Sequence, residues 1–140
     1  MTKVILVAHG ELGSSFLKSV TMIAGEQNPD EIAAVNFSPD DSRDDLQARI
    51  EEILVKFNPS ENHVVICCDL KAGSPFNASY LLSKKYPLHI IAGMNLPLLL
   101  EFILMKDSFE DLDSLNGLVD LSKELFEFES LKTLSMIARY

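Results

Sequence analysis

The fold of this chain is constrained most by four short apolar runs that alternate with longer amphipathic segments. The runs are Lys3–Ala8, Ile32–Phe37, Val64–Asp69 and Leu88–Ala92. Short runs that stay apolar are typical of strands buried on both faces of a sheet. Strands that alternate with helices pair in parallel through right-handed crossovers. The sequence therefore predicts an α/β fold over residues 1–140, a single doubly wound domain with a mainly parallel central sheet of four strands.

The first two segments between these runs carry helix signals. An apolar stripe predicts a helix over Ser15–Ala24. A second helix is expected from Ser42 to about Phe57, and Asp45, three residues after Ser42, completes a near capping box.

In the C-terminal half, Ser74 and Pro75 predict a helix that has Ser74 as its N-cap and runs to about Lys85. Further helices are predicted at Asn95 to about Lys106, Ser108–Leu115 and Val119–Phe128. Glu129–Tyr140 is ambiguous between a helix and a strand, and as a strand it would be a fifth one at the sheet edge.

Charge and cysteine content argue against several classes of protein. The net charge is −9 and the 12 Lys and Arg residues form no patch, which argues against nucleic-acid binding. Cys67 and Cys68 are adjacent and fit buried core thiols in a reducing compartment better than a disulfide or a zinc motif. The apolar run near the N-terminus is too short for a signal peptide. The apolar stretch Ile90–Met105 is interrupted by Gly, Asn, Pro and Glu residues and does not fit a membrane span. We expect a cytoplasmic protein that needs no metal and no cofactor.

Two residues with side chains suited to catalysis lie at the ends of strands, at one edge of the predicted sheet. His9 follows the first strand, and Asp69 ends the third. Because the carboxyl ends of parallel strands meet at the edge where open α/β sheets bind ligands, we expect these side chains to be neighbours. A carboxylate that accepts a hydrogen bond from Nδ1–H fixes the imidazole tautomer and leaves Nε2 as a nucleophile.

Small and hydroxyl residues beside this pair favour a bound phosphoryl group. The turn through Gly73 leads into a predicted helix, whose first N–H groups can hold an anion. Gly10 leaves room for another molecule next to His9. The sequence thus predicts a phosphohistidine site with His9 as phosphoryl acceptor, Asp69 as its orienting group, and phosphate contacts from Gly10, Gly73, Ser74 and Ser14.

Structural explanations of the same residues stay open at this point. A strand-end histidine is often a hydrogen-bonded structural residue, and Asp69 could cap the turn that follows it. His63 and His89 lie at predicted strand starts on the opposite edge, without an acidic neighbour in the sequence, and are interpreted as structural or surface residues. The acidic run Glu110–Asp113 is interpreted as a solvated helix face and not as a metal site.

Several segments together match the pattern of a known family. The most specific is Asp69 followed by Gly73-Ser74-Pro75-Phe76-Asn77-Ala78-Ser79. The others are His9-Gly10 after the first strand, Gly25-Glu26-Gln27, Asn36-Phe37 with Pro39, and Ile91-Ala92-Gly93-Met94-Asn95-Leu96-Pro97. On these motifs the chain resembles, over nearly its whole length, the IIA components of the mannose class of the bacterial phosphoenolpyruvate-dependent sugar phosphotransferase system (PTS).

The resemblance implies a phosphocarrier, that is, a phosphotransferase with a phosphohistidine intermediate. Nε2 of His9 would accept a phosphoryl group from phospho-HPr, with Asp69 as the orienting carboxylate and Ser74 as a phosphate contact. The group would then pass to a IIB subunit, which phosphorylates sugar during uptake through the membrane IIC and IID subunits. The resemblance also implies a homodimer that exchanges a C-terminal strand, for which Glu129–Tyr140 is the candidate.

Leu70-Lys71-Ala72 departs from the family's pattern, in which many members have an aromatic residue and a second glycine. Lys71 places an additional cation near the site. The alternative function is a phosphorylation-dependent regulatory module on the same fold. A histidine phosphatase is disfavoured because Ala8 stands where that chemistry needs an arginine. A phosphodonor subunit of dihydroxyacetone kinase is a further rival, which the Gly73–Ser79 block fits less well.

Overall fold

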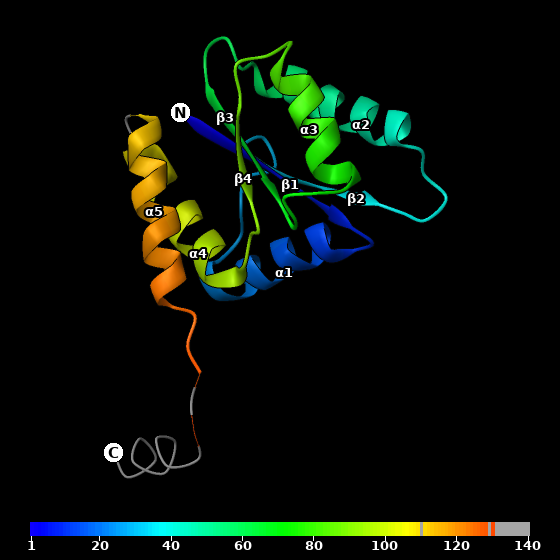
Figure 1. Ribbon diagram of the computed structural model, residues 1–140. Coiled ribbons are helices and arrows are strands. Elements are labelled where there is room, and N and C mark those ends of the chain that lie inside the picture. The colour runs from blue at the N-terminus through cyan, green and yellow to red at the C-terminus, as the bar shows by residue number, and fades with distance from the viewer. Residues whose placement is uncertain (110, 129, 131–140) are drawn as a thin grey trace.

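The structure, a computed structural model, describes residues 1–109, 111–128 and 130. Four parallel strands form one sheet in the order β2-β1-β3-β4, which confirms the predicted fold class (Figure 1). The strands are β1 (Thr2–His9), β2 (Ile32–Phe37), β3 (His63–Cys68) and β4 (His89–Ala92). The helices are α1 (Leu12–Ala24), α2 (Arg43–Phe57), α3 (Ser74–Ser83), α4 (Leu96–Met105), the 3-10 turn η1 (Lys106–Ser108) and α5 (Leu112–Glu124).

The helices cover both faces of the sheet (Figure 1). One apolar core lies between the sheet and α1, α4 and α5, and a second core lies between the sheet and α2 and α3. The chain leaves β1 toward one face through α1 and leaves β3 toward the other face through α3. The carboxyl ends of β1 and β3 are therefore the topological switch point, where folds of this type bind ligands.

Burial on both faces explains why the strands are continuously apolar. In β1, Val4 and Leu6 enter the first core, whereas Ile5 and Val7 enter the second. In β3, Cys67 enters the first core and Cys68 enters the second. Both are free thiols, as predicted. Burial raises the pKa of Cys68 to about 11, so this thiol stays protonated at neutral pH.

Two helix starts follow from their capping residues. In the predicted capping box, the Ser42 hydroxyl accepts from the Asp45 backbone N–H at 3.0 Å, and the Asp45 carboxylate accepts from the Ser42 N–H at 3.1 Å. Asn95 caps α4 in a similar way, because its side-chain oxygen accepts from the Leu98 N–H at 2.9 Å. These caps fix where α2 and α4 begin.

α1 begins at Leu12, three residues earlier than the sequence pattern predicts. Gly13 explains the difference, since a Cβ there would lie 3.2 Å from the carbonyl oxygens of both Leu6 and Val35. The absence of a side chain lets the first turn of α1 pack directly on the backbone of β1 and β2.

The predicted N-cap role of Ser74 is wrong. Gly73 is the N-cap, with φ +97° and ψ 177°, and Ser74 is the first helical residue. This backbone conformation is open essentially to glycine alone, so the helix start moves back by one residue. α3 also ends at Ser83, before the predicted Lys85.

The two short helices predicted over Ser108–Leu115 and Val119–Phe128 are also wrong, because α5 is one helix. It starts where the Asp111 carboxylate accepts from the Ser114 N–H at 3.1 Å. Gly117 interrupts the apolar pattern without breaking the helix. The tail Glu129–Tyr140, for which a fifth strand was an alternative, lies outside the described residues except for Ser130. None of the described helices is long and apolar enough to cross a membrane.

Candidate functional site

His9 and Asp69 meet at the switch point, as predicted from their strand ends. His9 is the last residue of β1, and Asp69 directly follows β3. The Nδ1 atom of His9 lies 2.8 Å from Oδ2 of Asp69. The backbone N–H of His9 donates to the same oxygen at 3.1 Å. One carboxylate oxygen thus holds both the strand end and the ring.

Asp69 is held in its ionised form. Burial by itself would raise the pKa of Asp69, but the hydrogen bonds from the ring and backbone of His9 outweigh burial and lower that pKa. The other carboxylate oxygen accepts from the Leu70 N–H at 3.0 Å. An ionised carboxylate can only accept, so Nδ1 of His9 carries a proton, and in the neutral imidazole Nε2 is then the atom that bears the lone pair.

The loop before α3 closes over the reactive edge of the imidazole. A Cβ on Gly73 would lie 3.1 Å from Cε1 and 3.2 Å from Nε2 of His9. The first N–H groups of α3 begin at this point, and they have no carbonyl partner within the helix. Among the described residues no hydrogen bond engages the Ser74 hydroxyl. Nε2 therefore faces free donors at the positive end of a helix dipole.

The other side of the ring is open to an incoming group. Gly10 has φ +59°, and apart from its neighbours in the chain, His9 and Glu11, no heavy atom of the described residues lies within 4 Å of where its Cβ would be. Its N–H donates to the Phe37 carbonyl at 2.7 Å, which extends the pairing of β1 with β2. The Phe37 ring stands edge-on to the imidazole at 6.0 Å between centroids. Since the His9 side chain is 44% exposed, another molecule can reach Nε2.

Ser14 lies near this edge with its donors already engaged. Its hydroxyl donates to the Glu11 carbonyl at 3.0 Å and accepts from Nδ2 of Asn36 at 2.9 Å. Its backbone N–H donates to Oδ1 of Asn36 at 3.1 Å. The predicted phosphate contact from Ser14 would require one of these bonds to be exchanged.

Asn36 is a residue whose role the sequence reasoning missed. It joins β2 to the first turn of α1 through two hydrogen bonds with Ser14. The available signal was a polar amide inside an otherwise apolar strand, which needs a hydrogen-bonding partner when it is partly buried.

Met94, which follows β4 at the same edge, is only 6% exposed and packs in the core under α4. His63 and His89 lie at the amino ends of β3 and β4, on the edge opposite His9, as predicted. In the part of the chain that the structure describes, no three His, Cys, Asp or Glu side chains are grouped so that they could hold a metal ion.

The chain is similar in sequence and in fold to known proteins. Residues 3–119 match the family described as PTS system fructose IIA component. The chain is 36% identical over 104 residues to the sorbose-specific EIIA component of Klebsiella pneumoniae, covering 74% of this chain and 73% of that protein. It is 30% identical over 145 residues to the fructose-specific EIIA component of Bacillus subtilis, covering 99% and 97%.

Structural similarity agrees with the sequence matches. The crystal structure of phosphotransferase system component EIIA from Streptococcus agalactiae superposes with a TM-score of 0.81 at 30% identity, covering 91% of this chain and 97% of that chain.

Proposed function

The chain belongs to the family of PTS system fructose IIA components, a mannose-class family of phosphocarriers in sugar uptake, and from this we propose that its phosphoryl group is carried on Nε2 of His9. The observation that carries the proposal is the 2.8 Å contact between Nδ1 of His9 and Asp69, which leaves Nε2 free. Nε2 then faces the start of α3, where anionic oxygens are stabilised.

The reaction is a transfer between two imidazoles. The P–N bond of the donor phosphohistidine breaks, and its electron pair stays on the donor nitrogen. The lone pair of His9 Nε2 forms the new N–P bond, while Nδ1 keeps its proton. Positive charge that develops on the His9 ring is stabilised by the Asp69 carboxylate. Such a loose transition state requires alignment and charge stabilisation more than further covalent chemistry.

The phosphoryl oxygens would lie between Gly10 and the first turn of α3. Gly73 and Ser74 supply donors there, and Gly10 supplies clearance for the donor protein. Ser14 joins this set only through an exchange of its bonds to Glu11 and Asn36.

The proposed partners are phospho-HPr as donor and a IIB subunit as acceptor, with the IIC and IID subunits downstream in the membrane. Both soluble partners would approach the exposed ring of His9 in turn, in the cytoplasm. This shared approach explains why one side of the ring is left open.

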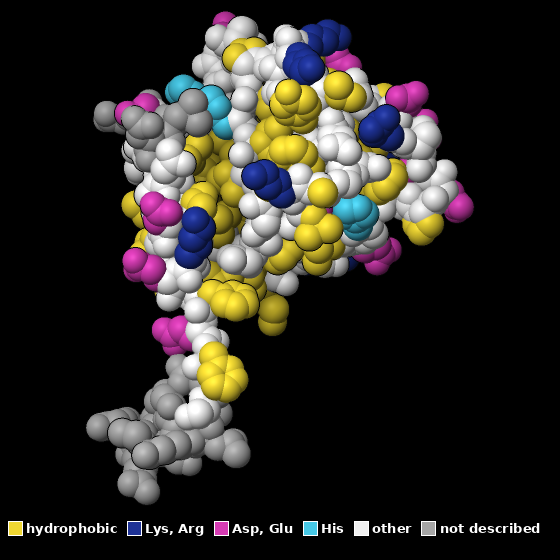
Figure 2. All heavy atoms as spheres, viewed as in Figure 1, with side chains coloured by type: hydrophobic (Ala, Val, Ile, Leu, Met, Phe, Trp, Pro, Cys, Tyr) yellow, Lys and Arg dark blue, Asp and Glu magenta, His cyan; other side chains and the backbone are white. Residues whose placement is uncertain are grey.

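We also propose a homodimer that exchanges the strand expected in Glu129–Tyr140. In its support, β4 has a neighbour on one side only among the described strands. A hollow of about 400 Å³ lies beside β4, with Ile91 on the strand and Leu115 and Val119 on α5 in its lining. Hydrophobic side chains follow this hollow between α5 and the rest of the fold (Figure 2). Sedimentation at micromolar concentration tests the dimer, and a monomer would contradict it.

Phosphorylation with phosphoenolpyruvate, enzyme I and HPr tests the carrier role. We expect one phosphoryl group per chain, acid-labile and base-stable, which tandem mass spectrometry maps to the peptide of His9 and not to those of His63 or His89. A His9→Ala variant that folds normally yet takes up the same label would contradict the proposal. Onward transfer to a IIB protein separates a carrier from a purely regulatory module, which would be phosphorylated without passing the group on.

A further inference from the structure

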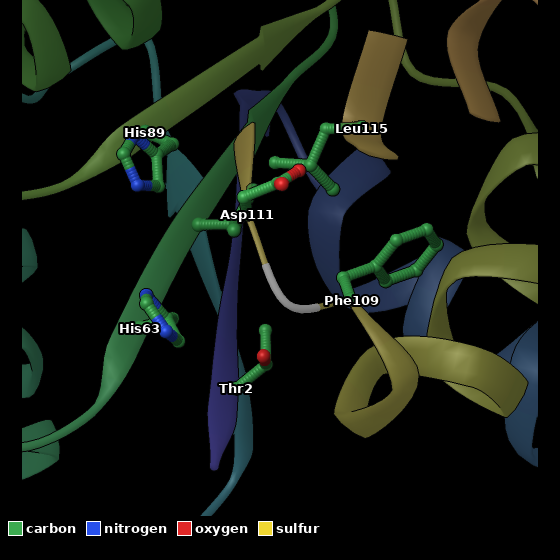
Figure 3. A pocket seen from close by; sticks show the side chains of 7 residues that line it. Thr2, His63, His89, Phe109, Asp111 and Leu115 are labelled. Atoms are coloured by element: carbon green, nitrogen blue, oxygen red, sulfur yellow. The ribbon is translucent and has the colours of Figure 1, made fainter. Parts of the chain in front are cut away.

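A second cavity lies at the edge of the sheet opposite His9. It has a volume of about 250 Å³ and lies between the amino ends of the strands and the start of α5. Figure 3 shows the imidazoles of His63 and His89 on one side, Phe109 and Leu115 on the other, and Thr2 between them. None of these residues takes part in the proposed phosphoryl transfer.

The strand register explains why three polar side chains converge here. Thr2 pairs with His63, and His89 pairs with Val65, two residues further along β3. Side chains two residues apart on a strand share a face. Thr2 and His63 therefore form the last row on the face that α5 covers, and His89 lies on the same face in the next row, beside Val65.

The side chains of Thr2, His63 and His89 have no hydrogen-bonding partner among the described residues. Thr2 is only 4% exposed, yet among the described residues its hydroxyl makes no hydrogen bond, since only its backbone N–H is engaged, by Asp107. The rings of His63 and His89 likewise make no hydrogen bond with described residues. His63 is exposed and His89 is half-buried, so these groups are open to the cavity, and polar groups that line a cavity without an internal partner can pair with a ligand there.

The only carboxylate in the described lining of the cavity is that of Asp111. One oxygen of this carboxylate accepts from the N–H and the hydroxyl of Ser114, both at 3.1 Å. Its charge is therefore compensated by the N-terminus of α5. Burial, with a smaller contribution from His63, lowers the pKa of His89, so this ring is neutral at pH 7. No Lys or Arg is among the described lining residues.

The remaining walls are apolar. Val65, Phe109 and Leu115 complete the described lining. A ligand that fits must present hydroxyl or amide groups to one side and C–H groups to the other. An anion would find no cation, a purely apolar molecule would leave the Thr2 hydroxyl unpaired, and a metal ion would find no triad of ligands among the described residues.

We propose that this cavity binds a neutral, polyhydroxylated ring of the size of one monosaccharide. Its hydroxyls pair with Thr2, His63, His89 and the free oxygen of Asp111, and its C–H face packs on Phe109 and Leu115. The ligand joins the amino ends of β1, β3 and β4 to the start of α5. This site is independent of the phosphoryl acceptor at the other edge.

The test is a titration of isotopically labelled protein followed by NMR, with D-mannose, D-glucose and myo-inositol as neutral probes. Mannose 6-phosphate and glucosamine serve as charged comparators of similar size. We expect at least one neutral probe to shift the imidazole signals of His63 and His89 saturably, together with the Thr2 amide, and to leave the His9 signals unchanged.

Two variants and a control make the result specific. Thr2→Val keeps the shape and removes only the hydroxyl, so the dissociation constant should rise about fivefold. Leu115→Phe narrows the cavity from the opposite wall and should abolish binding. Thr21→Val, on α1 away from the cavity, should leave the affinity unchanged. The proposal is overturned if no neutral probe gives a saturable shift, if a charged comparator binds better, or if Thr2→Val and Thr21→Val behave alike.

Discussion

Both edges of the sheet carry histidine side chains, but the hydrogen-bonding surroundings of these histidines differ. At the carboxyl edge, His9 has an ionised partner in Asp69, and α3 begins beside its Nε2 atom. At the amino edge, His63 and His89 have no hydrogen-bonded partner among the described residues, and the nearby carboxylate of Asp111 caps α5. Strand polarity gives the carboxyl edge the free N-termini of the helices that follow the strands, whereas the N-terminus of α5 at the amino edge is already capped by Asp111.

The largest effect that tests this difference is expected for Asp69→Asn. The amide can donate to Nδ1, which favours the tautomer with the proton on Nε2 and removes the nucleophilic lone pair. We expect the rate of phosphorylation by phospho-HPr to fall about 100- to 10,000-fold, as for a comparable change beside a catalytic histidine. Rapid-quench measurement gives the rate, and thermal unfolding controls for the fold. An unchanged rate would make Asp69 a structural cap, and the two edges would then be alike.

Gly73→Ala should have the next largest effect, with Gly93→Ala as its matched control. Both glycines have positive φ, +97° and +82°, so both substitutions strain the backbone. Only at position 73 does the new Cβ meet His9, whereas nothing lies within 4 Å at position 93. We expect both variants to lose about 1–2 kcal/mol of unfolding free energy.

Phosphorylation should fall at least about tenfold in Gly73→Ala alone, since a misplaced reacting atom costs more than backbone strain. Chemical denaturation and the phosphorylation assay measure the two effects separately. Equal rates in the two variants would show that the approach of Gly73 to Nε2 does not matter.

A smaller effect is expected for Asn36→Ala, which removes both bonds to Ser14. The unfolding free energy should fall by about 1–3 kcal/mol, because the Ser14 N–H loses its acceptor. Phosphorylation should slow less than in Gly73→Ala, since Asn36 supports α1 and not the reacting ring. Loss of phosphorylation as severe as in Asp69→Asn would place Ser14 among the phosphate contacts.

The smallest expected effects are those of pH on the unfolding free energy. The two edges should respond in different pH ranges. The pKa of His89 is lowered on folding, so the unfolded chain binds the proton more tightly, and stability falls as pH drops from about 7 to 5. The pKa of Asp69 is also lowered, so its contribution is present above its unfolded pKa of about 4 and is lost only at lower pH.

In His89→Gln, the loss of stability between about pH 7 and pH 5 should be smaller than in the unmodified protein. In Asp69→Asn, the loss of stability below about pH 4 should be smaller. Denaturant unfolding at a series of pH values measures both. If both variants changed the same pH range, the two edges would not titrate independently.

Much of the fold and the central pair followed from the sequence because they depend on pattern and polarity. Uniformly apolar runs predicted buried parallel strands, and parallel strands bring His9 and Asp69 together whatever the loops do. The contact of Gly73 with the imidazole did not follow, because it depends on a single loop conformation. The engagement of Ser14 by Asn36 and the convergence of His63 with His89 depend on strand register, which local sequence patterns leave open.

One oxygen of Asp69 accepts hydrogen bonds from both the backbone and the ring of His9, and this affects how ready the ring is for each transfer. Because Oδ2 accepts from both the backbone and the ring of His9, the torsion angles of the imidazole are fixed as soon as β1 and β3 pair. The torsional entropy of the ring is lost once, during folding, and not again at each collision with a donor or an acceptor. A group that is handed on repeatedly is thus received each time by a nucleophile already turned toward it.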